Sequence, residues 1–247
     1  MEPRARVVRV LEVDPDLGAD LDPSALEKAT RELAAPVFDV TWTTRSAQWG
    51  FDSEAIQLGL LVVDGLVIRE VRMLGTSSAE LLGAGDLLRP ADADGELTPP
   101  VAAEIRWTAL QPLAVAALDE SFLAKACGYP SVLARILGRV VARSKAQALH
   151  EAITNLRHVE TRVLVEFWHL AERWGRVGRT GVTIDLPLTH ELLAKLVGAA
   201  RPSVSTALGQ LAARGLLTRA GDSWLLSHES RRSLGSAPIP RDARIGR

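Results

Sequence analysis

One face of a predicted helix in the last quarter of this 247-residue sequence gathers side chains that can bind a polyanion. Its outer positions are Arg201, Ser203, Ser205, Thr206, Gly209 and Gln210. An arginine fork donates two parallel hydrogen bonds to a planar pair of acceptors, and hydroxyl groups bond phosphate oxygens. A purely solvated helix more often carries Glu and Lys, so this small, polar face headed by an arginine favours nucleic acid as its partner.

Two short helices joined by a tight turn are predicted to position this face. Thr189 can cap the first helix, and Gly198 permits the turn that ends it. The inward side chains of the first helix are Leu192, Leu193, Leu196 and Val197. The second helix spans about residues 201–213 and has Pro202 in its first turn, where the missing N–H costs nothing. Its inward side chains are Val204, Leu208 and Leu211.

This pair predicts a helix-turn-helix whose second helix enters the major groove of double-stranded DNA. Apolar runs at residues 216–218 and 224–226 flank a turn and predict a two-stranded wing. A structural alternative is an ordinary helical hairpin in a core. A functional alternative is a ligand-binding or protein-interaction module whose helix-turn-helix-like region serves assembly. Salt dependence discriminates between these functions, because phosphate contacts make DNA affinity fall steeply as salt rises.

The charge of the chain is divided between two parts. The formal net charge is −1, yet residues 1–128 carry 11 basic and 21 acidic side chains, whereas residues 129–247 carry 18 basic and 9 acidic ones. Such asymmetry is typical of a chain that binds a polyanion with one of its parts. The acidic part also discourages DNA from binding along the wrong face.

Short apolar runs broken by turn residues predict a β-rich N-terminal part. Strands are expected near residues 7–13, 58–71, 79–82 and 107–118, with a helix over 22–35 and a loop over 89–100. Asp64–Gly65 suits a type I′ turn, which would pair the two apolar runs of 58–71 as a hairpin. This pattern predicts a small barrel or jelly-roll-like β-roll.

A long helix is expected after the strands. Its stripe of large and then small residues at helical spacing is Leu133, Leu137, Val141, Ser144, Ala148 and Ala152. Small residues let another helix approach closely, so the stripe favours pairing with a second copy of the chain, over the alternative of packing on its own domain. A further helix over 157–174 is expected to end at Gly175, a suitable C′ residue.

The order of these elements resembles the superfamily of the cyclic-AMP receptor protein and the fumarate–nitrate reduction regulator. The resemblance is carried by the run LTHELLAKLVGAARPSVSTAL at 188–208, by Gly83–Asp86 and by the overall spacing. It implies an α+β fold: a β-roll sensor domain (1–128), a dimerisation helix and hinge (129–156), and a winged helix-turn-helix (157–227). A basic tail (228–247) is expected to be disordered.

The resemblance also implies roles for individual residues. Positions that face bases are occupied by Arg201, Pro202, Ser205 and Thr206, and positions that touch phosphates by Thr189, His190, Ser203 and Ser205. Arg201 suits guanine, because its fork meets O6 and N7 together. The family often has glutamate at the position of Pro202 and arginine at that of Thr206, so an unusual operator is expected. An idle, exposed His190 is the alternative to a phosphate contact.

Members of this superfamily often bind cyclic AMP through a Gly-Glu pair and an Arg-Ser pair. Here the first pair is replaced by Arg89–Pro90 and the second by Ala103–Glu104. The alternative Gly-Glu pair at 95–96 still lacks an Arg-Ser partner. Because a carboxylate in place of the phosphate-binding arginine repels the ligand, we expect a degenerate pocket at Arg89, Ala103 and Glu104, no cyclic AMP and an effector of unknown identity.

Other functions are disfavoured by composition. A single cysteine, Cys127, excludes an intramolecular disulfide and a four-cysteine iron–sulfur cluster. No metal site or other cofactor is expected, and no P-loop, dinucleotide fingerprint or G-x-S-x-G motif indicates an enzyme. No membrane span or signal peptide is found, so a cytoplasmic protein is expected. Its expected partners are a second copy of the chain and double-stranded DNA, with RNA polymerase as a further candidate.

Overall fold

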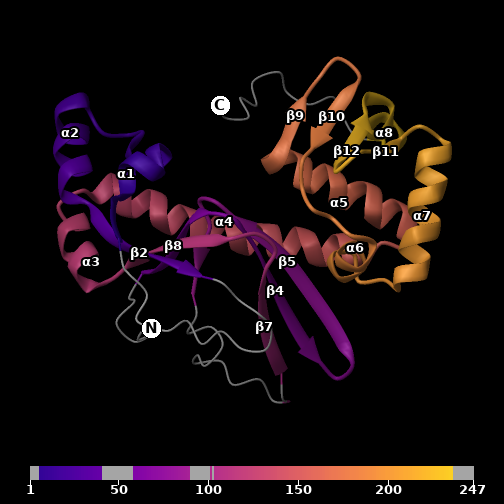
Figure 1. Cartoon of the computed structure of the whole chain (residues 1–247), viewed down its shortest axis with the longest axis horizontal. Coiled ribbons are helices and arrows are strands. Elements are labelled where there is room, and N and C mark those ends of the chain that lie inside the picture. Colours follow the sequence, from indigo (N-terminus) through magenta and orange to yellow (C-terminus); the bar gives the residue numbers. More distant parts are fainter. Residues whose placement is uncertain (1–5, 41–57, 90–100, 102, 236–247) are drawn as a thin grey trace. The chain divides into compact units, whose positions relative to one another are not determined.

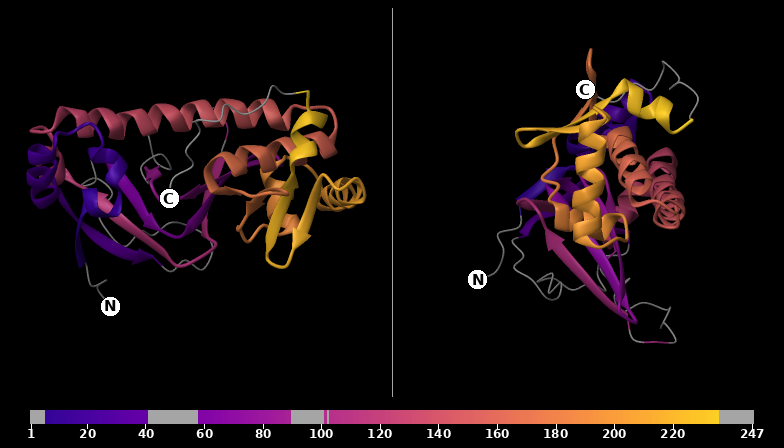
Figure 2. Two further views of the ribbon diagram at one scale, coloured as in Figure 1. Left: turned by 90° about the horizontal axis from the view of Figure 1, so that it is seen from above. Right: turned by 90° about the vertical axis from the view of Figure 1, so that its right-hand side faces the viewer.

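The computed structural model describes residues 6–40, 58–89, 101 and 103–235 (Figure 1). The chain divides into two compact units, Met1–Ala146 and Gln147–Arg247. The boundary falls inside helix α4 (Pro130–Thr154), which Figure 2 shows as one continuous helix. No helix among the described residues is long and apolar enough to cross a membrane.

Two antiparallel sheets form the β-roll of the first unit. One sheet has the strand order β1-β2-β8-β3-β6 and the other the order β5-β4-β7. The strands are β1 (Arg6–Arg9), β2 (Ala34–Val40), β3 (Gly59–Asp64), β4 (Leu66–Met73), β5 (Thr76–Gly83), β6 (Leu87–Leu88), β7 (Ala103–Ala109) and β8 (Leu113–Leu118). Buried side chains of both sheets, among them Leu60, Val67 and Trp107, form one core cluster. The predicted α+β fold class with an N-terminal β-roll is confirmed.

The expected hairpin at Asp64–Gly65 is wrong. Strands β3 and β4 lie in different sheets, and Gly65 (φ 95°) turns the chain from one to the other. A side chain at Gly65 would meet Pro112 O at 2.2 Å, so close approach explains the glycine. The hairpin is instead β4–β5, closed by Leu74 and Gly75, which both have positive φ as a type I′ turn requires. Leucine gives no sequence signal for that turn.

Four short helices and the first turns of α4 cover the five-stranded sheet. They are α1 (Val10–Val13), η1 (Pro15–Gly18), α2 (Pro23–Glu32) and α3 (Glu120–Ala126). The predicted strand over 7–13 therefore ends at Arg9. Val10 and Leu11 are both buried in α1, whose turn is closed by Asp14 N donating to Val10 O at 2.9 Å. Asp22 caps α2 by accepting from Ser24 N and Ala25 N, each at 3.0 Å.

Three arginines at four-residue spacing fasten α4 to its own unit. Arg135 donates to Asp20 at 2.5 and 2.7 Å, and Arg139 donates to Asp14 and to Gly85 O. Arg143 donates to Glu80 at 2.6 Å and to Leu87 O at 3.1 Å. The hydrogen bonds from Arg135 also lower the pKa of Asp20. Asp14 and Asp20, from the acidic N-terminal segment, thus serve as partners of α4.

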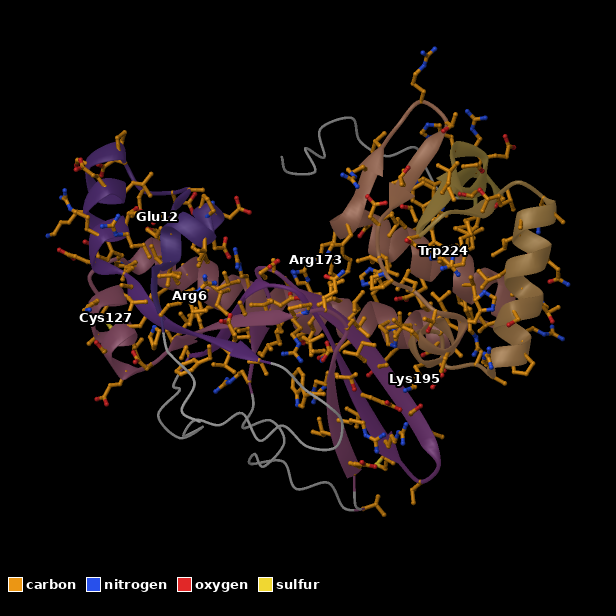
Figure 3. The ribbon with its side chains drawn as sticks, in the orientation of Figure 1. Arg6, Glu12, Cys127, Arg173, Lys195 and Trp224 are labelled. Atoms are coloured by element: carbon orange, nitrogen blue, oxygen red, sulfur yellow. The ribbon has the colours of Figure 1, made fainter. Side chains whose placement is uncertain are left out.

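The second unit surrounds a four-stranded sheet with helices. The sheet order is β11-β12-β10-β9. Its elements are α5 (Val159–Trp174), β9 (Gly175–Val177), β10 (Gly181–Ile184), α6 (His190–Leu196), α7 (Arg201–Ala213), β11 (Leu217–Ala220), β12 (Ser223–Ser227) and α8 (His228–Ser233). Phe167 and Trp224 pack with ring centroids 5.0 Å apart in its core, where Figure 3 labels Trp224.

Three expectations for this unit need correction. The wing is part of a larger sheet, because β10 pairs with both β9 and β12. Gly175 follows α5 with φ −79°, so it is required by close approach to Ala171 O rather than by a left-handed cap. Residues 228–233 form α8 where a disordered tail was expected: Ser230 is fully buried and accepts a hydrogen bond from Trp168 Nε1 at 3.1 Å. Residues 236–247 lie outside the described residues.

Candidate nucleic-acid interface

Helices α6 and α7 form the helix-turn-helix at the positions that the sequence predicts. Thr189 caps α6, since its Oγ1 accepts from Leu192 N at 3.1 Å. Gly198, with φ 58°, ends that helix, and Ala199 N donates to Ala194 O to close the turn. Helix α7 then begins at Arg201 after the extended residue Ala200. The predicted start of the second helix is therefore confirmed.

The inner face of α7 is held firmly in the unit. Val204 and Leu211 are fully buried, and Ala207 and Leu208 are nearly so. The helix packs on α5 and α6. Arg162 of α5 adds a polar tie, because its guanidinium donates to Leu156 O at 2.6 Å and to Gly198 O at 3.1 Å. One face of α7 is thus fixed, and the opposite face is presented to solvent.

The exposed face of α7 carries the predicted side chains. Its exposed members are Arg201, Pro202, Ser203, Thr206, Gly209 and Gln210. Among the residues that the structure describes, no carboxylate lies within ion-pair distance of Arg201. Two other arginines of this unit form ion pairs: Arg214 with Glu160, and Arg176 with Asp185. Arg201 is therefore available to an external acceptor.

Two hydroxyl groups of α7 have partners that the sequence analysis missed. A 2.8 Å hydrogen bond joins Ser205 Oγ to His190 Nδ1 on α6, and both side chains are half-buried. Thr206 Oγ1 donates to Pro202 O at 3.1 Å. Neither contact has a clear sequence signal, because the first spans 15 positions and the second depends on the rotamer. His190 is thus not idle: it links the two helices.

The wing places another arginine that the sequence analysis missed. Strands β11 and β12 are joined at Gly221 and Asp222, with Gly221 at φ 64°. Arg219 is exposed, lies 5.6 Å from the centroid of the Trp224 ring and donates to Gly221 O at 3.1 Å. These contacts hold its charge at the wing, so Arg219 is a further candidate for contact with a phosphate.

The predicted stripe of α4 divides into two parts. Leu133 is half-buried and packs on the core of its own unit. The remaining members, all exposed, are Leu137, Val141, Ser144, Ala148 and Ala152. Leu137 and Val141 are 58% and 54% exposed, which is high for large apolar side chains in the middle of a helix. The same helix also exposes Val140 and Leu149, which the predicted stripe omitted.

The residues expected to form a degenerate effector pocket lie at the end of strand β6 and at the start of strand β7. Arg89 follows β6 and is exposed, and Pro90 lies outside the described residues. Ala103 and Glu104 begin β7. Arg106 donates to Glu104 at 2.7 Å and thereby lowers the pKa of this exposed carboxyl. Glu104 therefore stays ionised near neutral pH.

Other candidate sites receive no support from the geometry. Within the described ranges, no group of three or more His, Cys, Asp and Glu side chains is placed to hold a metal ion. Cys127 is an exposed free thiol at the end of α3 (Figure 3). The turn Gly83–Asp86, one of the family signals, is closed by Asp86 Oδ2, which accepts from Gly83 N at 2.8 Å.

Comparison with known proteins agrees with this geometry. Residues 161–231 match the model of the Crp-like helix-turn-helix domain. The chain is 26% identical to the regulatory protein CysR of Synechococcus elongatus over 178 residues, which are 71% of this chain and 68% of that protein. The C-terminal unit thus contains a Crp-like helix-turn-helix domain, and the chain is similar in sequence to a transcription regulator over most of its length. The resemblance stated from the sequence is thereby confirmed.

Two further proteins resemble the regulator, one in part of its sequence and one in its fold. It is 33% identical to the CRP-like cAMP-activated global transcriptional regulator of Mycobacterium tuberculosis over 99 residues, or 40% of this chain and 43% of that protein. A CooA variant from Carboxydothermus hydrogenoformans has the same fold, with a TM-score of 0.58 and 14% identity over 91% of the regulator and 95% of that chain.

Removal of either partner of the His190–Ser205 hydrogen bond is expected to destabilise the regulator. His190→Ala and Ser205→Ala should each lower the free energy of unfolding by about 1 kcal/mol, because a half-buried polar atom loses its partner. The double variant should cost less than the sum, with a coupling of about 0.5 kcal/mol or more. Thermal or urea unfolding measures this cycle. Additive losses would contradict the contact.

Proposed function

We propose that the regulator acts as a homodimer that binds a palindromic operator through α7 of each copy, without control by cyclic AMP. The observation that carries this proposal is Arg201, which has no ion-pair partner in the described part of the chain and begins a helix whose inner face is buried. A fixed helix can hold a base-reading side chain in register with the groove, and a free guanidinium loses no internal ion pair on binding.

Arg201 is the residue that we assign to guanine. Its fork matches O6 and N7 of guanine in the major groove. Ser203 and Thr189 lie exposed near the starts of α7 and α6, where phosphate contacts would set the register of the helix. The Ser205–His190 pair connects the two helices, and His190 Nε2 remains for a phosphate. These contacts favour DNA reading over the alternative in which the helix-turn-helix serves assembly.

The exposed stripe of α4 supports the homodimer. Large apolar side chains exposed along several turns of one helix are unfavourable in water, and a second copy would cover them. A two-fold axis along such helices relates two identical DNA-binding units. Two recognition helices would then enter successive major grooves about 34 Å apart, which predicts a palindromic operator.

Cyclic AMP is excluded from this proposal by charge. The phosphate of cyclic AMP needs a positive or hydrogen-bonding partner where this chain has Ala103 and the ionised Glu104. The carboxylate would repel the phosphate, and the methyl group of alanine offers no hydrogen bond.

Any effector must prefer one arrangement of the dimer over another in order to act. We place the regulator in the cytoplasm with its operator, and RNA polymerase remains a candidate partner.

Arg201→Ala is expected to weaken operator binding by about 1–3 kcal/mol and to relax the preference at one G·C pair in each half-site. The operator is first selected from random duplex DNA by the full chain, and affinities are then measured at two salt concentrations. Binding of the unaltered chain should fall steeply with salt. Arg31→Ala, which alters an exposed arginine of α2, is the control and should change neither quantity. Failure to retain any duplex at low salt would refute DNA binding.

Val141→Glu is expected to convert the homodimer into a monomer, because two carboxylates would be buried against each other in the interface. Sedimentation or light scattering gives the mass in solution. Ala142→Glu is the matched control: it adds the same charge at an exposed position about 100° around the helix. A dimer that survives Val141→Glu but not Ala142→Glu would place the interface on another face.

Isothermal calorimetry with cyclic AMP or cyclic GMP is expected to show no saturable heat at neutral pH, because Glu104 is ionised there. The titration should be repeated with operator DNA present, since a linked effector binds more tightly to the state that binds DNA. A saturable isotherm with a micromolar Kd in either titration would refute independence from cyclic nucleotides.

A further inference from the structure

The exposed face of α7 carries one side chain whose polar group is turned back onto its own helix. Thr206 Oγ1 donates to Pro202 O at 3.1 Å, although Thr206 is exposed. The hydroxyl oxygen and the methyl carbon diverge from the same Cβ atom. With the hydroxyl directed at the carbonyl four residues earlier, the methyl group is what this residue offers to a partner.

Pro202 extends this apolar surface by one turn. It lies four residues before Thr206, so both side chains share a face of the helix, and its ring has no N–H to donate. On the other side, Gly209 has no side chain, and nothing lies within 4 Å of the position a Cβ would occupy. The patch formed by Pro202 and Thr206, the 202/206 patch, is therefore apolar and open.

Two polar groups beside the patch already have roles. The hydroxyl group of Ser205 on α7 is hydrogen-bonded to His190 on α6. Arg201, immediately before the patch, forms no ion pair with any residue that the structure describes. The start of α7 thus presents a strong donor beside the apolar 202/206 patch, with the exposed side chains of Ser203 and Gln210 at the edges of the patch. A helix with this surface cannot read every base pair through hydrogen bonds, because the 202/206 patch offers apolar groups.

Only one base has an apolar group on its major-groove edge. Thymine carries the C5-methyl group, whereas guanine, cytosine and adenine present donors and acceptors there. An apolar patch gains free energy against that methyl group and leaves the polar edges of the other bases without partners.

We propose that Thr206, together with Pro202, determines specificity by selecting a thymine in the half-site, at a base pair neighbouring the guanine read by Arg201. This inference rests on the proposed function, because it requires α7 to lie in the major groove. It assigns a second sequence-specific base pair to each half-site and identifies the C5-methyl group of thymine as the group contacted.

The experiment removes the methyl group from either side of the contact. The operator selected by the full chain is resynthesised with deoxyuridine in place of each candidate thymine, which deletes only the C5-methyl group. Deoxyuridine at the contacted position should weaken binding about fourfold per half-site, the worth of one buried methyl-sized group. The effect should be confined to one symmetric pair of positions.

Two variants assign the effect to Thr206. Thr206→Ser keeps the hydroxyl and removes the methyl group, so it should bind the thymine and deoxyuridine operators equally. Thr206→Val keeps a methyl group and removes the hydroxyl, so it should retain the roughly fourfold discrimination. Arg201→Ala should lose preference at guanine while still distinguishing thymine from deoxyuridine.

The outcomes separate this inference from the proposed function. If an operator is selected but no deoxyuridine substitution lowers affinity, the thymine assignment is refuted and DNA reading stands. Discrimination that persists in Thr206→Ser would refute the role of Thr206 alone. If no operator is selected and binding does not depend on salt, the proposed function fails, and this inference fails with it.

Discussion

The buried inner face of α7 is the constraint on which the rest of the DNA-binding unit depends. Each large aliphatic side chain fully buried there contributes about 1.5–3 kcal/mol. Val204, Leu208 and Leu211 therefore fix the rotation of the helix about its axis, and Arg162 holds the preceding turn from α5. Because the helix cannot rotate, Arg201 and the 202/206 patch face outward together. Reading a base requires that kind of rigidity.

Helix α4 is the second organising element, and its opposite sides have different roles. One side is fastened to the β-roll by ion pairs from Arg135, Arg139 and Arg143. The other side exposes Leu137 and Val141. Arginines that bind within the unit keep this side turned outward, which favours the homodimer. Asp14 and Asp20 thus help to hold α4 against the β-roll.

Much of the candidate site could be predicted from the sequence, because its signals are local. Thr189, Gly198 and the spacing of Leu192, Val204 and Leu208 each act within a few residues, and the helix-turn-helix follows from them. The β-roll was predicted as a class but not in its pairing. Both apolar runs around Asp64 are buried, and a continuous apolar run does not say which strand pairs with it. The helix α8 was missed because the contact of Ser230 with Trp168 joins positions far apart in the sequence and leaves no local signal.

By itself the sequence determined the capped start of α6, the arginine that begins α7 and the division of charge along the chain. These depend on side-chain type and on spacing within a few turns of helix. Only the tertiary structure decided the partner of Ser205, which meets His190 because two helices cross. The bond from Thr206 to Pro202 lies within α7, and it depends on which rotamer the threonine adopts. What the recognition helix shows to DNA therefore depends on packing and rotamers, which no local pattern records.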